Sequence, residues 1–141
     1  MVYLNDEDIT KAIYTLLNKN VSVINMSFGD TLCSDYFRKM INIAKYNNIA
    51  LVASAGNSNI NLDYFGHYPS NYSNVIAVGA KDFSGNHILN YGNKVTRYEI
   101  GYQVPYFYFD KHGRSQKITI YGSSASSIRY ASELVRKSPH R

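Results

Sequence analysis

Two short segments contain the residue types that hydrolytic chemistry needs. Residues 121–127 read Tyr-Gly-Ser-Ser-Ala-Ser-Ser, between an apolar stretch and a helical pattern. A serine at the amino end of a helix gains from the helix dipole and from free N–H groups, which both favour developing negative charge. Residues 53–57 read Ala-Ser-Ala-Gly-Asn after another apolar stretch, and the amide of Asn57 is a candidate donor to the same oxyanion. The two segments predict part of a hydrolase site, without an evident acid or base partner.

Local structure explains each segment when it is taken alone. Ser124 is a candidate helix N-cap, and Asn57 is a candidate turn former. That simpler interpretation is favoured for either motif in isolation. The elements that position the two segments therefore decide between the interpretations.

Helical and strand patterns alternate along the chain. Apolar residues recur at helical spacing over residues 9–17, 33–46 and 127–137, and Asn5 or Asp6 can cap the first of these helices. Short apolar runs typical of buried strands cover residues 21–28, 49–55 and 74–80, and residues 117–121 predict a last strand that leads into the serine segment. This order predicts an α/β fold with an open, mostly parallel sheet and helices on both faces.

Three segments of small and polar residues follow predicted strands: residues 27–29, 54–57 and 122–124. Binding sites of open α/β sheets form at the carboxyl ends of the strands, so these segments are expected to meet there. Residues 56–73 are rich in Asn, Ser, Gly and Tyr and predict a long surface loop. Residues 98–109 predict an extended, aromatic-rich stretch.

Composition excludes several classes of protein. The chain has 141 residues, 45% hydrophobic and 18% charged, which is typical of one globular domain. No run approaches the roughly 20 apolar residues of a membrane span, no signal peptide is evident, and no compartment is indicated. The net charge of +5 comes from scattered or terminal basic residues, which argues against nucleic acid. The single cysteine, Cys33, excludes an internal disulfide and is more simply a small residue at a helix start than a reactive thiol.

Together and in this order, the segments resemble the subtilisin-like serine peptidases, the subtilases. The family's middle strand typically reads Val-Ile-Asn-Met-Ser-Leu-Gly, and residues 23–29 read Val-Ile-Asn-Met-Ser-Phe-Gly. The oxyanion segment Ala-Ala-Gly-Asn corresponds to residues 54–57, and the nucleophile motif Gly-Thr-Ser-Met-Ala-Ser to residues 122–127. Residues 68–80 match a further family stretch that runs from Tyr-Pro to Val-Ile-Ala-Val-Gly-Ala. The resemblance implies a single, partial subtilisin-like peptidase domain over residues 1–141.

The resemblance also implies a role for each site residue. Ser124 looks like the acyl-accepting nucleophile, and Asn57 looks like the side-chain oxyanion donor, with the Ser124 N–H as its backbone companion. The residues that look like the walls of the substrate cleft are Ser27, Phe28, Gly29, Ala53, Ser54, Ala55 and Gly56. Asp30 stands where the family often has a second glycine. It could favour basic residues in the substrate, although a solvated loop aspartate is the favoured interpretation.

The family's aspartate motif and histidine helix do not occur in this sequence. In the family both precede the Val-Ile-Asn-Met-Ser strand, and residues 1–22 contain neither. None of the four histidines (His67, His87, His112 and His140) lies in a matching motif. Serine is a weak nucleophile until a positioned base takes its proton. The chain is therefore expected to be inactive alone, and the sheet is expected to be incomplete on its amino-terminal side.

Two functions fit this pattern. One is a serine endopeptidase domain whose aspartate and histidine come from elsewhere, and the other is a pseudopeptidase that binds extended peptides. A nucleotide-binding α/β domain is set aside, because no Gly-x-Gly-x-x-Gly or Gly-Lys-Ser/Thr motif occurs. The expected partner is a peptide or protein substrate. No cofactor is expected; subtilases often bind calcium, but no carboxylate cluster here supplies assignable ligands.

The predicted strand at residues 21–28 carries a physical consequence. In family members its neighbouring strands belong to the segment that is not found here, so this strand is expected to be an apolar edge with unpaired backbone groups. We expect the isolated chain to be poorly soluble, to form a homo-oligomer, or to pair with a complementary amino-terminal subtilase fragment.

Overall fold

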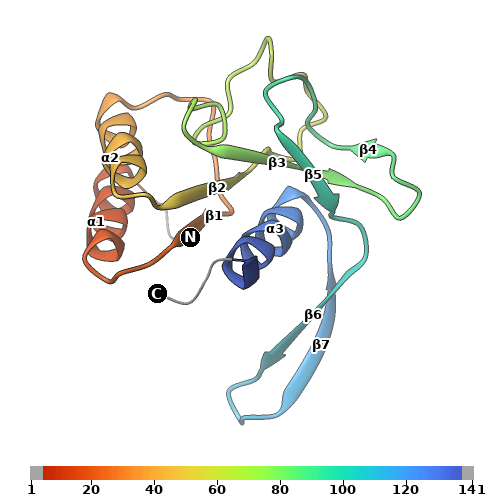
Figure 1. Ribbon diagram of the computed structural model, residues 1–141. Helices are drawn as coiled ribbons and strands as arrows, with labels where there is room; N and C mark the ends of the chain where they lie inside the picture. The colour runs from red at the N-terminus through yellow and green to blue at the C-terminus, as the bar shows by residue number, and fades with distance from the viewer. Residues whose placement is uncertain (1–4, 138–141) are drawn as a thin grey trace.

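The computed structural model describes residues 5–137 and contains a main sheet, a separate hairpin and three helices in that part of the chain (Figure 1). The main sheet contains β1 (Val23–Met26), β2 (Ala50–Ser54), β3 (Ile76–Lys81), β4 (His87–Ile88) and β5 (Arg97–Ile100). β1, β2, β3 and β5 pair in parallel, and β4 alone pairs antiparallel, with β3. The predicted open, mostly parallel sheet is therefore confirmed.

Helices cover both faces of this sheet. On one face, α1 (Asp6–Leu17) and α2 (Asp35–Tyr46) bury a core that includes Ile13, Phe37, Ile41, Met26 and Leu51. On the other face, α3 (Ser123–Lys137) packs Ala131 against Val52 and Val78. Leu51 and Val52 are consecutive residues of β2 that point to opposite faces, as the alternation of side chains along a strand requires.

Capping side chains begin the first two helices. The Asn5 side chain accepts a hydrogen bond from the Asp8 N–H at 2.8 Å, which confirms the predicted cap. Ser34 caps α2 by accepting from the Phe37 N–H at 3.2 Å. Cys33 therefore lies just before the helix, where it is exposed and accepts a hydrogen bond from the Arg38 guanidinium at 2.8 Å.

The last predicted strand is confirmed, but it lies outside the main sheet. β6 (Val104–Phe109) and β7 (Ser115–Ile120) form a separate antiparallel hairpin that extends away from the sheet (Figure 1). Phe107, Phe109 and Ile118 of this hairpin are 63%, 76% and 45% exposed. An alternating apolar pattern indicates a strand but does not identify its partner strand.

Hydrogen bonds nevertheless hold the serine segment against the main sheet. The Gly122 N–H donates to the carbonyl of Gly101, directly after β5, at 2.8 Å. α3 begins at Ser123, earlier than the helical pattern predicts, so Ser124 lies in the first turn rather than at the cap.

Within residues 5–137, no helix has the length and apolar composition that a membrane crossing requires.

Candidate active site

Ser124 lies against the end of β1. Its hydroxyl donates to the Ser27 carbonyl at 3.3 Å, and the Ser27 hydroxyl lies 3.0 Å from the hydroxyl of buried Ser127. The Ser127 hydroxyl in turn donates to the Ser124 carbonyl at 3.0 Å. The structure thus joins two of the predicted site segments, although about a hundred residues of chain separate them.

Asn57 is held in a fixed orientation beside the same helix start. Its side-chain oxygen Oδ1 accepts from both the N–H and the hydroxyl of Ser123, each at 2.9 Å. Ser123 is 1% exposed, and its hydroxyl also accepts from the Gly56 N–H at 3.0 Å. Because a backbone N–H can only donate, Oδ1 must face Ser123 and the amide nitrogen Nδ2 must face away.

The Asn57 Nδ2 is therefore an available donor. Asn57 is exposed, and within residues 5–137 its Nδ2 donates to no protein group. The Ser124 N–H lies in the first turn of α3, where helix N–H groups have no intrahelical acceptor. An oxyanion hole needs two such donors near the nucleophile, so Asn57 and the Ser124 N–H are candidates for this role.

Gly122 allows Asn57 to approach the helix. Its φ of +112° is one that side chains with a Cβ rarely adopt, and a Cβ there would lie 3.1 Å from both terminal atoms of the Asn57 amide. A residue with a side chain would therefore be strained and would also push Asn57 out of position.

Replacing Gly122 with alanine should lower the free energy of unfolding by more than the matched change Gly113→Ala. Gly113 also has a positive φ, +74°, but a Cβ there meets nothing within 4 Å. Backbone strain alone should cost about 1–3 kcal/mol at either position, and only Gly122→Ala should add the displacement of Asn57. Urea unfolding of both variants measures the difference, and equal losses would show that the contact with Asn57 has no energetic weight.

The two predicted walls of the cleft differ in how exposed their residues are. Ser27 and Phe28 are half-buried and Gly29 is exposed. In the second wall, Ala53, Ser54 and Ala55 are at most 3% exposed. Their side chains belong to the interior, so a ligand could meet this wall only through its backbone and at its end, next to Asn57.

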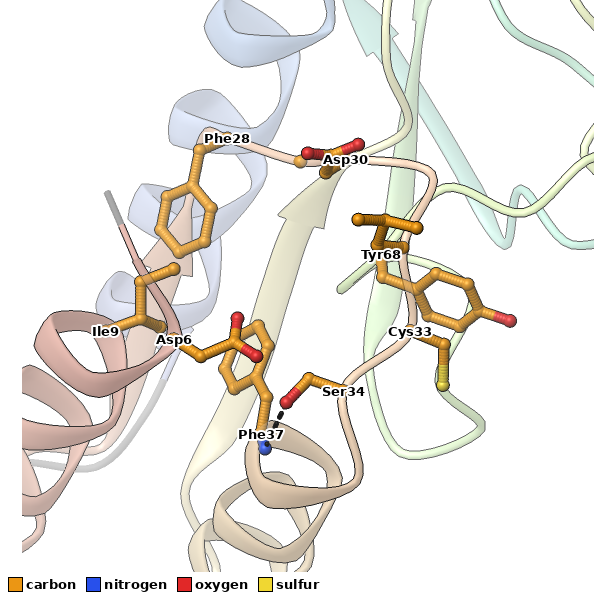
Figure 2. A pocket seen from close by; sticks show the side chains of 10 residues that line it. Asp6, Ile9, Phe28, Asp30, Cys33, Ser34, Phe37 and Tyr68 are labelled. Atoms are coloured by element: carbon orange, nitrogen blue, oxygen red, sulfur yellow. Dashed lines mark hydrogen bonds between the residues drawn. The ribbon is translucent and has the colours of Figure 1, made fainter. Parts of the chain in front are cut away.

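A cavity of about 430 Å³ with a mixed polar and apolar lining adjoins the first wall, between the starts of α1 and α2 (Figure 2). Ile9, Phe28 and Phe37 line it, and Asp30 lines it as well. The Asp30 carboxylate accepts from the N–H and the hydroxyl of Thr31, at 2.5 and 3.2 Å. These bonds and its exposure agree with a solvated loop aspartate.

His67 lies between the two walls, which the sequence did not indicate. The residue after it joins the loop that follows the first wall: the Asp30 N–H donates to the Tyr68 carbonyl at 2.9 Å, and the Tyr68 N–H donates to the Asp30 carbonyl at 2.7 Å. A Cβ on Gly29 would lie 2.7 Å from the His67 Nε2, and a Cβ on Gly56 would lie at the same distance from it. Glycines on both walls thus make room for one imidazole ring.

Ser70 fixes the ring and its tautomer. The Ser70 hydroxyl donates to the His67 carbonyl at 2.7 Å, and the ring nitrogen Nδ1 lies 3.1 Å from the same oxygen. The hydroxyl has only one proton, so Nδ1 must be the donor to Ser70, and the neutral ring carries its lone pair on Nε2. Burial lowers the pKa of His67 below its ordinary value, and the charge of Asp30 opposes the shift.

The lowered pKa of His67 predicts a loss of stability in acid. Below the unfolded pKa of about 6.5 the unfolded chain binds a proton that the folded ring resists, so stability falls as the pH drops through that value. Urea unfolding at pH 7.5 and 5.5 should show a larger loss for the wild type than for His67→Gln. His112→Gln, at an exposed turn, should behave like the wild type, and identical losses in all three chains would contradict the prediction.

No described histidine takes the role of a base for Ser124. Within residues 5–137, His67 contacts Ser70, His87 stacks on Tyr98 with ring centroids 3.5 Å apart, and His112 lies in the hairpin turn. His140 lies outside the described residues. In the same part of the chain, no three His, Cys, Asp or Glu side chains are grouped so that they could share a metal ion.

Known proteins resemble this chain in sequence. The model of the subtilase family matches residues 3–131. A thermostable alkaline protease of Halalkalibacterium halodurans is 36% identical over 80 residues, which are 55% of this chain and 20% of that protein. The chain thus covers only a small part of the curated relative.

Solved structures share the fold. A prenylagaramide maturation protease has a TM-score of 0.79 at 24% identity, over 93% of this chain and 48% of its own. The epidermin leader peptide processing serine protease of Staphylococcus aureus has a TM-score of 0.76 at 21% identity, over 89% of this chain and 42% of its own. The chain spans less than half the length of either protein.

Proposed function

This chain belongs to the subtilase family, and we propose that it supplies the nucleophile and the oxyanion hole of a subtilisin-like serine endopeptidase. The observation that carries the proposal is the orientation of Asn57, whose Oδ1 accepts from Ser123, the residue before Ser124, while its Nδ2 stays available as a donor. If Asn57 served only to form a turn, its side-chain amide would not need hydrogen bonds from the buried Ser123 to fix its orientation. Ser124 in the first turn of α3 has the N–H that completes the pair of donors.

The proposed reaction proceeds through an acyl-enzyme. The Ser124 hydroxyl attacks the scissile carbonyl and gives its proton to a base, and the carbonyl oxygen becomes an oxyanion bound by Asn57 Nδ2 and the Ser124 N–H. Collapse of this intermediate breaks the C–N bond, and the amine leaves with a proton returned by the base. Water then hydrolyses the ester by the same steps, which releases the carboxylic acid and restores Ser124.

The base and its aspartate are proposed to come from a segment outside residues 5–137. In the described part of the chain the Ser124 hydroxyl donates to the Ser27 carbonyl, which cannot take its proton. Residues 1–141 then form one part of a subtilisin-like domain, inactive without the remainder. The complementary segment is proposed to pair with the free edge of β1, since in residues 5–137 this strand pairs only with β2.

This edge predicts how the purified chain behaves. An apolar strand with unpaired N–H and C=O groups is a template for further pairing, so the 141-residue chain alone should self-associate. Light scattering at micromolar concentration measures this. A monodisperse monomer would argue against a missing strand at β1.

A pseudopeptidase is the second candidate function. The hydrogen bond from Ser124 to the Ser27 carbonyl favours it, because the hydroxyl is then a structural donor that joins α3 to β1. In that case the oxyanion hole would serve to bind a peptide carbonyl or a terminal carboxylate, without a covalent step.

A fluorophosphonate probe separates the two functions. The chain is affinity-tagged, expressed in its source cells and isolated with whatever it binds there; we call this sample the native assembly. In the endopeptidase, the probe should modify Ser124 in the native assembly and leave the lone chain unmodified, as located by mass spectrometry. Absence of modification in a folded native assembly would support the pseudopeptidase, and rapid modification of the lone chain would refute the need for an external base.

A further inference from the structure

We propose that His67 fills the pocket for the substrate residue on the acyl side of the scissile bond, and so restricts this cleft to peptides with a small residue there. The inference rests on the proposed function, because it takes the segments at Gly29 and Gly56 as the two walls of a peptide-binding cleft. In addition to the proposed function, it assigns to His67 the role of determining which peptides the cleft accepts.

The position of the ring is the first argument. The imidazole lies close to the Cα of both Gly29 and Gly56, since a Cβ on either would come within 3.0 Å of several ring atoms. Gly56 directly precedes Asn57, the proposed oxyanion donor. A peptide carbonyl bound by Asn57 therefore has its side chain next to the wall that His67 occupies.

The second argument is that the ring cannot easily leave. The paired backbone hydrogen bonds between Asp30 and Tyr68 anchor the loop next to His67, and Pro69 and Ser70 are buried. Ser70 accepts from the ring and donates to the His67 carbonyl, so one hydroxyl holds both the ring and the backbone of His67. A large substrate side chain would have to displace the ring and break these contacts, whereas a small side chain need not.

The chemistry of the second ring nitrogen of His67, Nε2, also favours a small substrate residue. The neutral tautomer presents the Nε2 lone pair between the walls, so the floor of the pocket is a hydrogen-bond acceptor rather than an apolar surface. Alanine and glycine fit above it, and the serine hydroxyl can donate to it. An aromatic ring would bury the acceptor without a donor, which is unfavourable.

Peptide binding to the native assembly tests this proposal. Two fluorescent tetrapeptides that differ only in a carboxyl-terminal alanine or phenylalanine are compared by fluorescence anisotropy. The wild type should bind the alanine peptide at least about tenfold more tightly, and His67→Ala should bind the phenylalanine peptide at least about tenfold more tightly than the wild type does. His112→Ala, which changes an exposed histidine of the hairpin turn, should bind both peptides like the wild type.

Each outcome of the peptide-binding experiment either supports or overturns the proposed role of His67. If wild type and His67→Ala bind the two peptides with the same preference, the proposed role of His67 is overturned. The proposed endopeptidase function would still stand, because fluorophosphonate labelling of Ser124 in the same samples tests it separately. A wild type that binds the phenylalanine peptide as tightly as the alanine peptide overturns the role of His67 even if His67→Ala does not fold. Failure of every chain to bind either peptide would overturn the cleft itself, and this inference with it.

Discussion

Replacing Ser124 with alanine is expected to lower the kcat of the native assembly by about 10⁶-fold, a loss known for the nucleophile of another subtilase. The whole covalent route depends on this oxygen, because the first bond to the scissile carbonyl forms from it. The residual rate should come from substrate binding and from the oxyanion donors, which the substitution leaves in place. Hydrolysis of a quenched fluorescent peptide library measures the loss.

The same substitution should leave folding almost unchanged. The Ser124 hydroxyl makes one hydrogen bond of 3.3 Å to a carbonyl, in a half-buried position. Removing such a bond costs about 0.5–1.5 kcal/mol. Ser132→Ala is a matched control, because this exposed serine of α3 also donates to a backbone carbonyl and is remote from the cleft. A stability loss of several kcal/mol with little loss of kcat would instead assign Ser124 a structural role.

Much of the fold could be predicted from residue spacing. Apolar residues at helical intervals between Asn5 and Leu17 gave the first helix with its cap, and the short apolar runs gave β1, β2 and β3 to within a few residues. Consecutive buried side chains along β2 follow from helices on both faces of a parallel sheet. These signals are local, so a single sequence contains them.

The parts that could not be predicted depend on contacts between distant residues. β7 has an alternating pattern that fits either a sheet strand or a hairpin, and only its pairing with β6 decides. His67 resembles any loop histidine in the sequence. Its position depends on the bonds between Asp30 and Tyr68 and on the absence of side chains at Gly29 and Gly56. Two glycines on opposite walls were the available signal, and they gain this meaning only once the walls face each other.

Replacing Asn57 with aspartate or leucine is expected to lower kcat by at least about 10²–10³, the magnitude known for loss of the oxyanion amide in another subtilase. Both substitutions remove the Nδ2 donor, which acts only where charge develops on the carbonyl oxygen. KM should therefore change far less than kcat. Peptide hydrolysis by the native assembly measures both constants.

The two substitutions differ in their effect on folding, and that difference assigns the role. Aspartate keeps an oxygen that accepts from the N–H and the hydroxyl of Ser123, whereas leucine leaves these buried donors without their acceptor. Leucine should therefore cost about 1–3 kcal/mol of stability and aspartate much less, while both lose activity. If Asn57→Asp retained wild-type kcat, Asn57 would act only as an acceptor that holds Ser123. A large loss of kcat in a stable Asn57→Asp chain can come only from the side of the amide that faces the substrate, which is where the oxyanion would form.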